Sequence, residues 1–167
     1  MKHEDLGDLG DREDFGDLED LMDEALVASR SAGARGDWPV AALVVKDGKI
    51  VGRGQNEQIT RTDVTWHAET AAIRDAQRAL GASDLSGCTL VGPMEPCPMC
   101  AWAIRIAGID RLVLALRYAT LKRTDLGRYD VESFARMVDW PLELVLGVRE
   151  AEYLALRQPF EAARKKS

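Results

Sequence analysis

The sequence has no apolar run approaching the roughly 20 residues that a helix needs to span a bilayer. Its N-terminal stretch is acidic and lacks the basic start and apolar centre of a signal peptide. These two absences argue against a membrane-embedded or exported chain. We therefore expect a soluble cytoplasmic protein without a membrane partner.

Cysteine and histidine are both scarce, with three cysteines and two histidines in 167 residues. A small, odd number of cysteines does not suit a framework of structural disulfides. Two of the cysteines, Cys97 and Cys100, form a C-x-x-C pair. In a cytosolic chain that spacing indicates metal or redox chemistry.

Basic residues are few at the N-terminus, where eleven of the 28 acidic residues fall within positions 1–24 beside only Lys2 and Arg12. Positions 1–16 combine these acids with glycines and have too little apolar surface to fold alone. We expect a mobile acidic arm there and a single domain over 17–167. The net charge of −6 disfavours nucleic acid as a partner, although the chain behind the arm is mildly basic.

Apolar residues make up 46% of the chain, and their spacing predicts helices and strands in alternation. Helices are expected over 17–31, 65–80, 98–107, 131–138 and 150–157. Strands are expected over 40–45, 50–51, 89–91, 111–116 and 142–146. Asp47-Gly48 is a strong hairpin signal between the first two strands. Gly33 and Gly36 are expected to end the first helix, and Pro93 and Pro96 the third strand.

This order of elements predicts an α/β fold, a three-layer α/β/α sandwich. The last two strands are about 25 residues apart and are separated by a helix, which is enough for a right-handed crossover. We therefore expect those two strands to be parallel.

Two short clusters carry the chemistry of the sequence. His67-Ala68-Glu69 opens one predicted helix, and Pro96-Cys97-Pro98-Met99-Cys100 lies at a strand-to-helix turn. Zinc prefers tetrahedral nitrogen and sulfur ligands, and His67, Cys97 and Cys100 supply three of them, leaving the fourth position for water. The positive ends of the helices favour the thiolate form that binds the metal.

Glu69 would lie near this metal without binding it. There it can accept a proton from the metal-acidified water, pass one to a ring nitrogen and protonate the departing ammonia. H-x-E followed by P-C-x-x-C is the signature of zinc deaminases. The residues therefore predict hydrolytic deamination of a nucleobase-type ring, with Glu69 as the proton shuttle.

Two other interpretations, a redox site and a structural zinc site, fit these residues less well. A redox site would not require His67 and Glu69, and a structural zinc site would need a fourth ligand. The spare donors are Cys88, which we expect to be simply buried, and His3 in the acidic arm. A zinc-stabilised binding module without catalysis is the alternative from another functional class.

Four segments resemble the cytidine deaminase-like superfamily, in the branch of tRNA adenosine deaminases and small guanine deaminases. They are Trp38-Pro39-Val40-Ala41-Ala42, Asn56, Thr62-Asp63-Val64-Thr65 before Trp66-His67, and Met94-Glu95-Pro96-Cys97-Pro98-Met99-Cys100. The similar region runs from about Leu18 to Leu156. The resemblance implies a five-stranded mixed sheet between helices, a homodimer, Asn56 as a base contact, and the Ala68 N–H facing the water or substrate.

The chain departs from the family pattern at three bulkier residues. Ala41 and Trp102 replace usual glycines, and Trp66 replaces a small residue before His67. Such residues either reshape the pocket or pack in the core or at a dimer contact. We expect all three to pack in the core, with Trp66 also a candidate substrate contact beside the zinc motif. The segment 117–133, where family members select their substrate, matches neither branch.

The substrate we favour from sequence is a small purine base or nucleoside such as guanine. The acidic chain weakens attraction to a polyanion, and Trp66 and Trp102 add bulk where an anticodon loop would need room. The alternative is adenosine-to-inosine deamination of tRNA. It is supported by the basic Arg164-Lys165-Lys166 tail and by residues 144–152, which resemble the end of the tRNA enzymes.

Overall fold

The computed structural model describes residues 15–123 and 125–164. Nearly all of the predicted acidic arm therefore lies outside the described residues, and the first helix begins at Phe15. Among the described residues, no helix is both long enough and apolar enough to cross a membrane.

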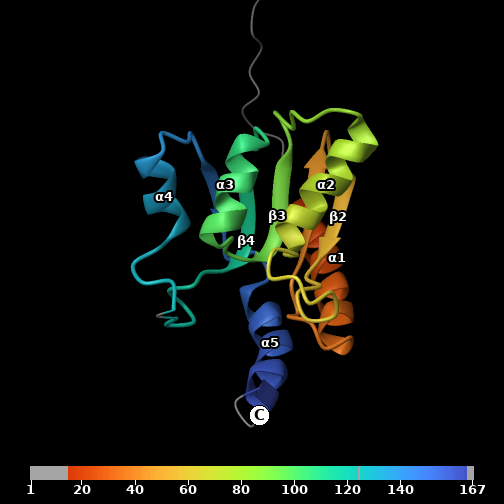
Figure 1. Ribbon diagram of the computed structural model, residues 1–167, viewed down its shortest axis with the longest axis vertical. Coiled ribbons are helices and arrows are strands. Elements are labelled where there is room, and N and C mark those ends of the chain that lie inside the picture. Colours follow the sequence, from red (N-terminus) through yellow and green to blue (C-terminus); the bar gives the residue numbers. More distant parts are fainter. Residues whose placement is uncertain (1–14, 124, 165–167) are drawn as a thin grey trace, which may run out of the picture.

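Five strands form one mixed sheet in the order β2-β1-β3-β4-β5, and five helices surround it (Figure 1). The strands are β1 (Ala41–Lys46), β2 (Lys49–Gln55), β3 (Thr89–Met94), β4 (Arg111–Leu116) and β5 (Glu143–Leu146). The helices are α1 (Phe15–Ala34), α2 (Ala68–Leu80), α3 (Pro98–Ile106), α4 (Val131–Met137) and α5 (Glu150–Arg164).

Strand directions agree with the predicted connections. β1 is antiparallel to β2 and β3, whereas β3, β4 and β5 run parallel. The β1–β2 hairpin turns at Asp47 and Gly48, whose φ angles are 50° and 70°. Two consecutive positive φ angles match the twist of a tight hairpin, which explains the Asp-Gly pair.

The sheet separates two apolar layers, which confirms the three-layer sandwich. β4 shows the alternation most clearly: Leu112 and Leu114 join the core with α2, α3 and α4, and Val113 and Ala115 join the core with α1 and α5. Successive side chains of a strand point to opposite faces, so this uninterrupted apolar strand serves both layers.

Several element boundaries differ from the sequence expectation. α1 continues through Gly33 and turns only at Gly36, whose φ is 95°. β2 extends to Gln55, because pairing with β1 continues to Ala41. β3 does not stop before Pro93, since its parallel pairing with β4 continues to Met94.

The last helix was also underestimated, because α5 runs past Pro159 to Arg164. Its last turns are held against the body by the Phe160 ring, whose centroid lies 5.4 Å from that of Trp38. Arg157 pairs with Glu161 on the same helix. The tertiary Trp38–Phe160 contact and the ion pair within the helix together offset the cost of an internal proline.

Candidate metal centre and active site

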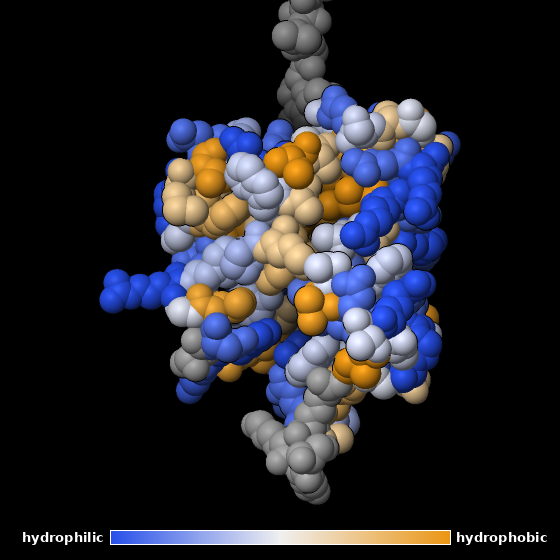
Figure 2. All heavy atoms as spheres, in the orientation of Figure 1, coloured by the Kyte–Doolittle hydropathy of each residue, from blue (hydrophilic) through white to orange (hydrophobic). Residues whose placement is uncertain are grey.

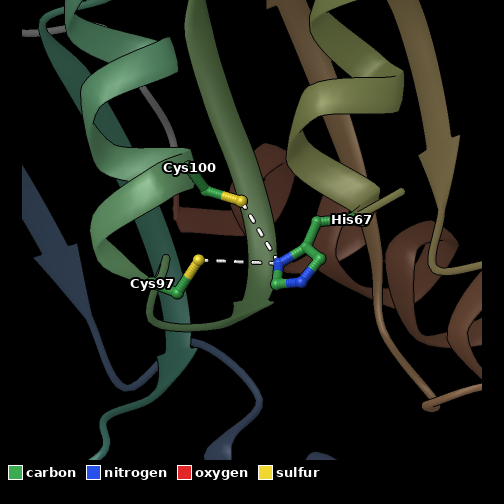
Figure 3. A group of neighbouring side chains, drawn as sticks. All are labelled: His67, Cys97 and Cys100. Carbon is green, nitrogen blue, oxygen red and sulfur yellow. Dashed lines mark hydrogen bonds between the residues drawn. The ribbon is translucent and has the colours of Figure 1, made fainter. Parts of the chain in front are cut away.

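The three predicted metal ligands converge at the starts of two neighbouring helices (Figure 3). His67 is the N-cap of α2 and Cys97 is the N-cap of α3, both with extended backbone. Cys100 lies in the first turn of α3. The parallel strand β3 leads directly into this turn, so sheet and helices fix all three side chains.

The donor atoms fit a zinc ion. His67 Nδ1 lies 3.6 Å from Cys97 Sγ and 3.4 Å from Cys100 Sγ. Tetrahedral zinc with ordinary Zn–N and Zn–S bonds separates nitrogen and sulfur by about 3.6 Å. All three donor atoms lie within 4.8 Å of one another. One nitrogen and two sulfurs at this spacing form the three-ligand set of a zinc site that keeps one position open.

The two thiols differ in acidity because they interact with each other. The hydrogen bond from Cys100, aided by His67, holds the pKa of the Cys97 thiol at about 4. The same interaction and burial raise the pKa of Cys100. The hydrogen bond to Cys97 also raises the pKa of His67, against the opposing effect of burial. Cys97 thus readily holds the negative charge that a metal-binding sulfur requires.

Glu69 lies in the first turn of α2, two residues after His67, and is only 5% exposed. Burial raises the pKa of its carboxyl, and the nearby charge of His67 partly opposes this rise. A carboxyl in this setting can hold a proton at a pH where an exposed glutamate would not. The structure therefore brings Glu69 beside the metal ligands.

Asn56 and Ala68 lie at the two ends of the loop that joins β2 to α2, and a backbone hydrogen bond brings these ends together. The Glu57 N–H donates to the Trp66 carbonyl at 3.1 Å, which places Asn56 near the start of α2. The Asn56 side chain is buried and pairs with Gln58 within its own loop. Ala68 is the first residue of α2 and is fully buried.

Residues 16–116 match the family described as the cytidine and deoxycytidylate deaminase zinc-binding region. This chain belongs to that family. The match contains all three predicted ligands and Glu69, so zinc is the cofactor implied for the cluster.

Curated proteins similar to this chain include two whose names refer to tRNA. A tRNA(Ile)-lysidine synthase of Deinococcus radiodurans is 40% identical over 87% of this chain and 25% of its own length. A tRNA-specific adenosine deaminase of Agrobacterium fabrum is 48% identical over 55% of this chain and 60% of its own length. The chain thus spans a quarter of the first relative and less than two thirds of the second.

Solved structures of the family include a purine enzyme. A guanine deaminase from Nitrosomonas europaea has a TM-score of 0.77 and 27% identity, over 86% of this chain and 84% of that chain.

The three residues that depart from the family pattern have different environments. Ala41 is fully buried, as expected. Trp102 is 46% exposed, so its assignment to the core was wrong; it contacts Phe134 edge-on at 6.3 Å. Trp66 is half-buried, with its ring between the guanidinium groups of Arg61 and Arg74 at 4.0 and 5.1 Å.

Three functional candidates were missed in the sequence. Glu95, two residues before Cys97, is 1% exposed. Tyr129 lies near the metal cluster, because its hydroxyl donates to the carbonyl of Pro96, next to Cys97, and the Tyr118 ring lies 6.3 Å from the Tyr129 ring. Burial, together with nearby negative charges, raises the pKa of both phenols. Glu95 could have been noticed beside the P-C-x-x-C motif, whereas no pattern marks the tyrosines.

Proposed function

We propose that this chain catalyses the hydrolytic deamination of an amino-substituted purine and releases ammonia. The observation that carries the proposal is the buried carboxyl of Glu69 beside a three-donor metal cluster. A purely structural zinc site would have four protein ligands. Among the described residues, the cluster contains His67, Cys97 and Cys100 and no fourth donor.

Zinc held by these three residues would supply a Lewis acid and an acidified water. Glu69 accepts the proton as the water oxygen bonds to the ring carbon that carries the amino group. The same carboxyl delivers this proton to the adjacent ring nitrogen. It then takes the second proton from the oxygen now bonded to the ring carbon and delivers it to the amino group. The carbon–nitrogen bond breaks, ammonia leaves, and the ring retains the oxygen.

Three groups close to the metal ligands in the chain or in the fold suit a flat, polar ring. The Asn56 amide provides a donor and an acceptor, and the Ala68 N–H is one of the first-turn amides that a helix leaves without an internal partner. Trp66 directly precedes His67 in the chain, and its ring lies between the guanidinium groups of Arg61 and Arg74. We propose these three as substrate contacts.

A free purine base, with guanine tested first, is the substrate we favour. The likeness to the guanine deaminase structure, which extends over most of both chains, supports it. Adenosine in tRNA is the second candidate, favoured by the identity with a tRNA-specific adenosine deaminase.

An ammonia-release screen tests the proposal and separates these substrates. It compares guanine, guanosine, adenine, adenosine, cytosine and cytidine with an unmodified tRNA carrying adenosine at the first anticodon position. We expect turnover of a free purine. If inosine formed in the tRNA at a rate that falls steeply with salt, and no free compound were turned over, the substrate would be tRNA adenosine and not a free purine.

The matched inactive variant is Glu69→Gln, which keeps the size of the side chain but removes its proton-carrying carboxyl. We expect zinc content and folding to be retained and turnover to fall at least about a hundredfold. Ammonia release at the wild-type rate would refute the role of Glu69. No turnover of any compound by the wild-type protein would favour the non-catalytic binding module.

A further inference from the structure

Glu95 is a buried carboxylate that the proposed reaction does not use. It follows β3 directly and is only 1% exposed. Its Oε2 accepts a hydrogen bond from the Tyr118 N–H at 2.8 Å, and its Oε1 accepts one from the Val131 N–H at 2.7 Å. Arg117 Nε lies 3.4 Å from Oε2. A buried carboxylate is costly unless its oxygens are paired in this way.

The two backbone donors mark both ends of one connection. Tyr118 comes just after β4, and Val131 is the first residue of α4. We call residues 118–123 and 125–130 the β4–α4 loop. Its two ends therefore meet on the two oxygens of a single side chain. A further tie is the Tyr129 hydroxyl, which donates to the Pro96 carbonyl at 2.8 Å, next to Cys97.

The β4–α4 loop brings aromatic side chains toward the site. Tyr118 and Tyr129 have ring centroids 6.3 Å apart. Tyr129 is held at the site by geometry, because its hydroxyl bonds to the carbonyl of Pro96, the residue directly before Cys97. The loop thus lies beside the turn that carries Cys97, and its position there depends on Glu95 and Pro96.

We propose that Glu95 is a positioning residue that clasps the β4–α4 loop against the zinc motif and thereby sets substrate affinity. The clasp connects two parts of the site directly, because Glu95 is two residues from Cys97 and holds both ends of the loop. The role in affinity rests on the proposed deaminase function. The structural part of the proposal, that one carboxylate holds the loop closed, is tested without any substrate.

Glu95→Gln tests the clasp with little change of shape. One carboxylate oxygen becomes an amide nitrogen, which cannot accept from a backbone N–H. We expect hydrogen exchange in residues 118–131 to accelerate at least about tenfold, because one charge-assisted hydrogen bond is lost. Exchange in α1 and zinc content should stay at wild-type values. On the purine identified by the screen, KM should rise about tenfold while kcat changes less than about threefold.

Val131→Pro tests the same bond from its other side and leaves Glu95 intact. Val131 occupies the first position of α4, where proline is favoured because its missing N–H needs no helical acceptor. The preceding Asp130 is extended, with φ −141° and ψ 153°, which is compatible with a following proline. We expect faster loop exchange and a raised KM, and a double variant with Glu95→Gln that falls short of the summed effects. If Glu95→Gln does not fold, Val131→Pro by itself still tests whether the hydrogen bond to Glu95 holds the loop.

Asp84→Asn is the matched control, because Asp84 holds a loop at the opposite end of β3 by accepting from the Ser86 N–H and hydroxyl. It should leave exchange in 118–131 and KM unchanged. The proposal is overturned if both clasp variants leave that exchange unchanged, if exchange rises equally across the sheet, or if kcat falls with KM constant. Absence of any turnover by the wild-type protein would refute the deaminase function and the affinity role, while the exchange result would still decide the clasp.

Discussion

His67 Nδ1 faces two sulfur atoms, and each of those atoms is fixed by the first turn of α3 (Figure 3). The backbone fixes two of the three ligands. His67 and Cys97 are both N-caps with extended backbone, and the helices that they begin, α2 and α3, lie on either side of the cluster. The helix N-termini add favourable partial charge for thiolates. Zinc affinity should therefore depend on the sulfur atoms of Cys97 and Cys100 and not on the third cysteine, Cys88.

We predict that the variant Cys97→Ser/Cys100→Ser loses zinc. Hydroxyl groups are much weaker zinc ligands than thiolates, and His67 alone cannot retain the ion. Metal analysis of purified protein should give near-stoichiometric zinc for the wild type and almost none for the variant. Cys88→Ala is the matched control, since Cys88 is a buried free cysteine outside the cluster, and it should keep its zinc. Full zinc in the double variant would eliminate this ligand set.

At the scale of elements, the position of His67 depends on how closely α2 packs on β2. Gly52 and Gly54 permit this approach. A Cβ at Gly54 would lie 2.1 Å from the Ala68 carbonyl oxygen and 2.3 Å from the Ala72 nitrogen. These neighbours are backbone atoms of α2 and cannot rotate away, so a larger residue must displace the helix that begins next to His67.

We predict that Gly54→Ala destabilises the fold by at least about 2 kcal/mol and weakens zinc retention. Denaturant unfolding, together with zinc release to a chelator, measures both effects. Gly92→Ala in β3 is the control: its Cβ would meet neighbours at ordinary contact distances, the nearest at 3.6 Å. It should change stability by less than about 1 kcal/mol. Equal behaviour of the two variants would contradict the packing argument.

At the scale of the whole molecule, one surface exposes several large apolar side chains (Figure 2). Met99, Trp102 and Ile106 on α3 are 38%, 46% and 66% exposed, and Met137 on α4 is 73% exposed. Apolar side chains gathered on one face favour an interface over a solvated surface. We propose that a second copy of this chain covers the face in a two-fold homodimer.

We predict that Ile106→Glu shifts the protein from dimer to monomer, because a buried charge without a partner opposes association. Light scattering at micromolar concentration measures the mass. Val27→Glu is the control, since Val27 is 72% exposed on α1, which covers the other face of the sheet. It should remain dimeric. A monomeric wild-type protein at this concentration would count against the dimer.

Local patterns in the sequence were sufficient for the fold class and the metal centre. Asp47-Gly48 specified the hairpin through its backbone preferences, and the apolar run 111–116 predicted a strand covered on both faces. The spacing within His67–Glu69 and Cys97–Cys100 predicted the cluster, because each pair lies within one helical turn. Such features depend on neighbours in the chain and can be read without knowing the fold.

Tertiary structure decided the features that join distant segments. Glu95 binds the N–H groups of Tyr118 and Val131, which are 23 and 36 residues away. The exposure of Trp102 and the continuation of β3 past Pro93 likewise depend on what packs or pairs beside them. A sequence pattern records local spacing and polarity. It does not record which backbone donors a buried carboxylate will meet, because that follows only after the sheet has brought the ends of β3 and β4 together.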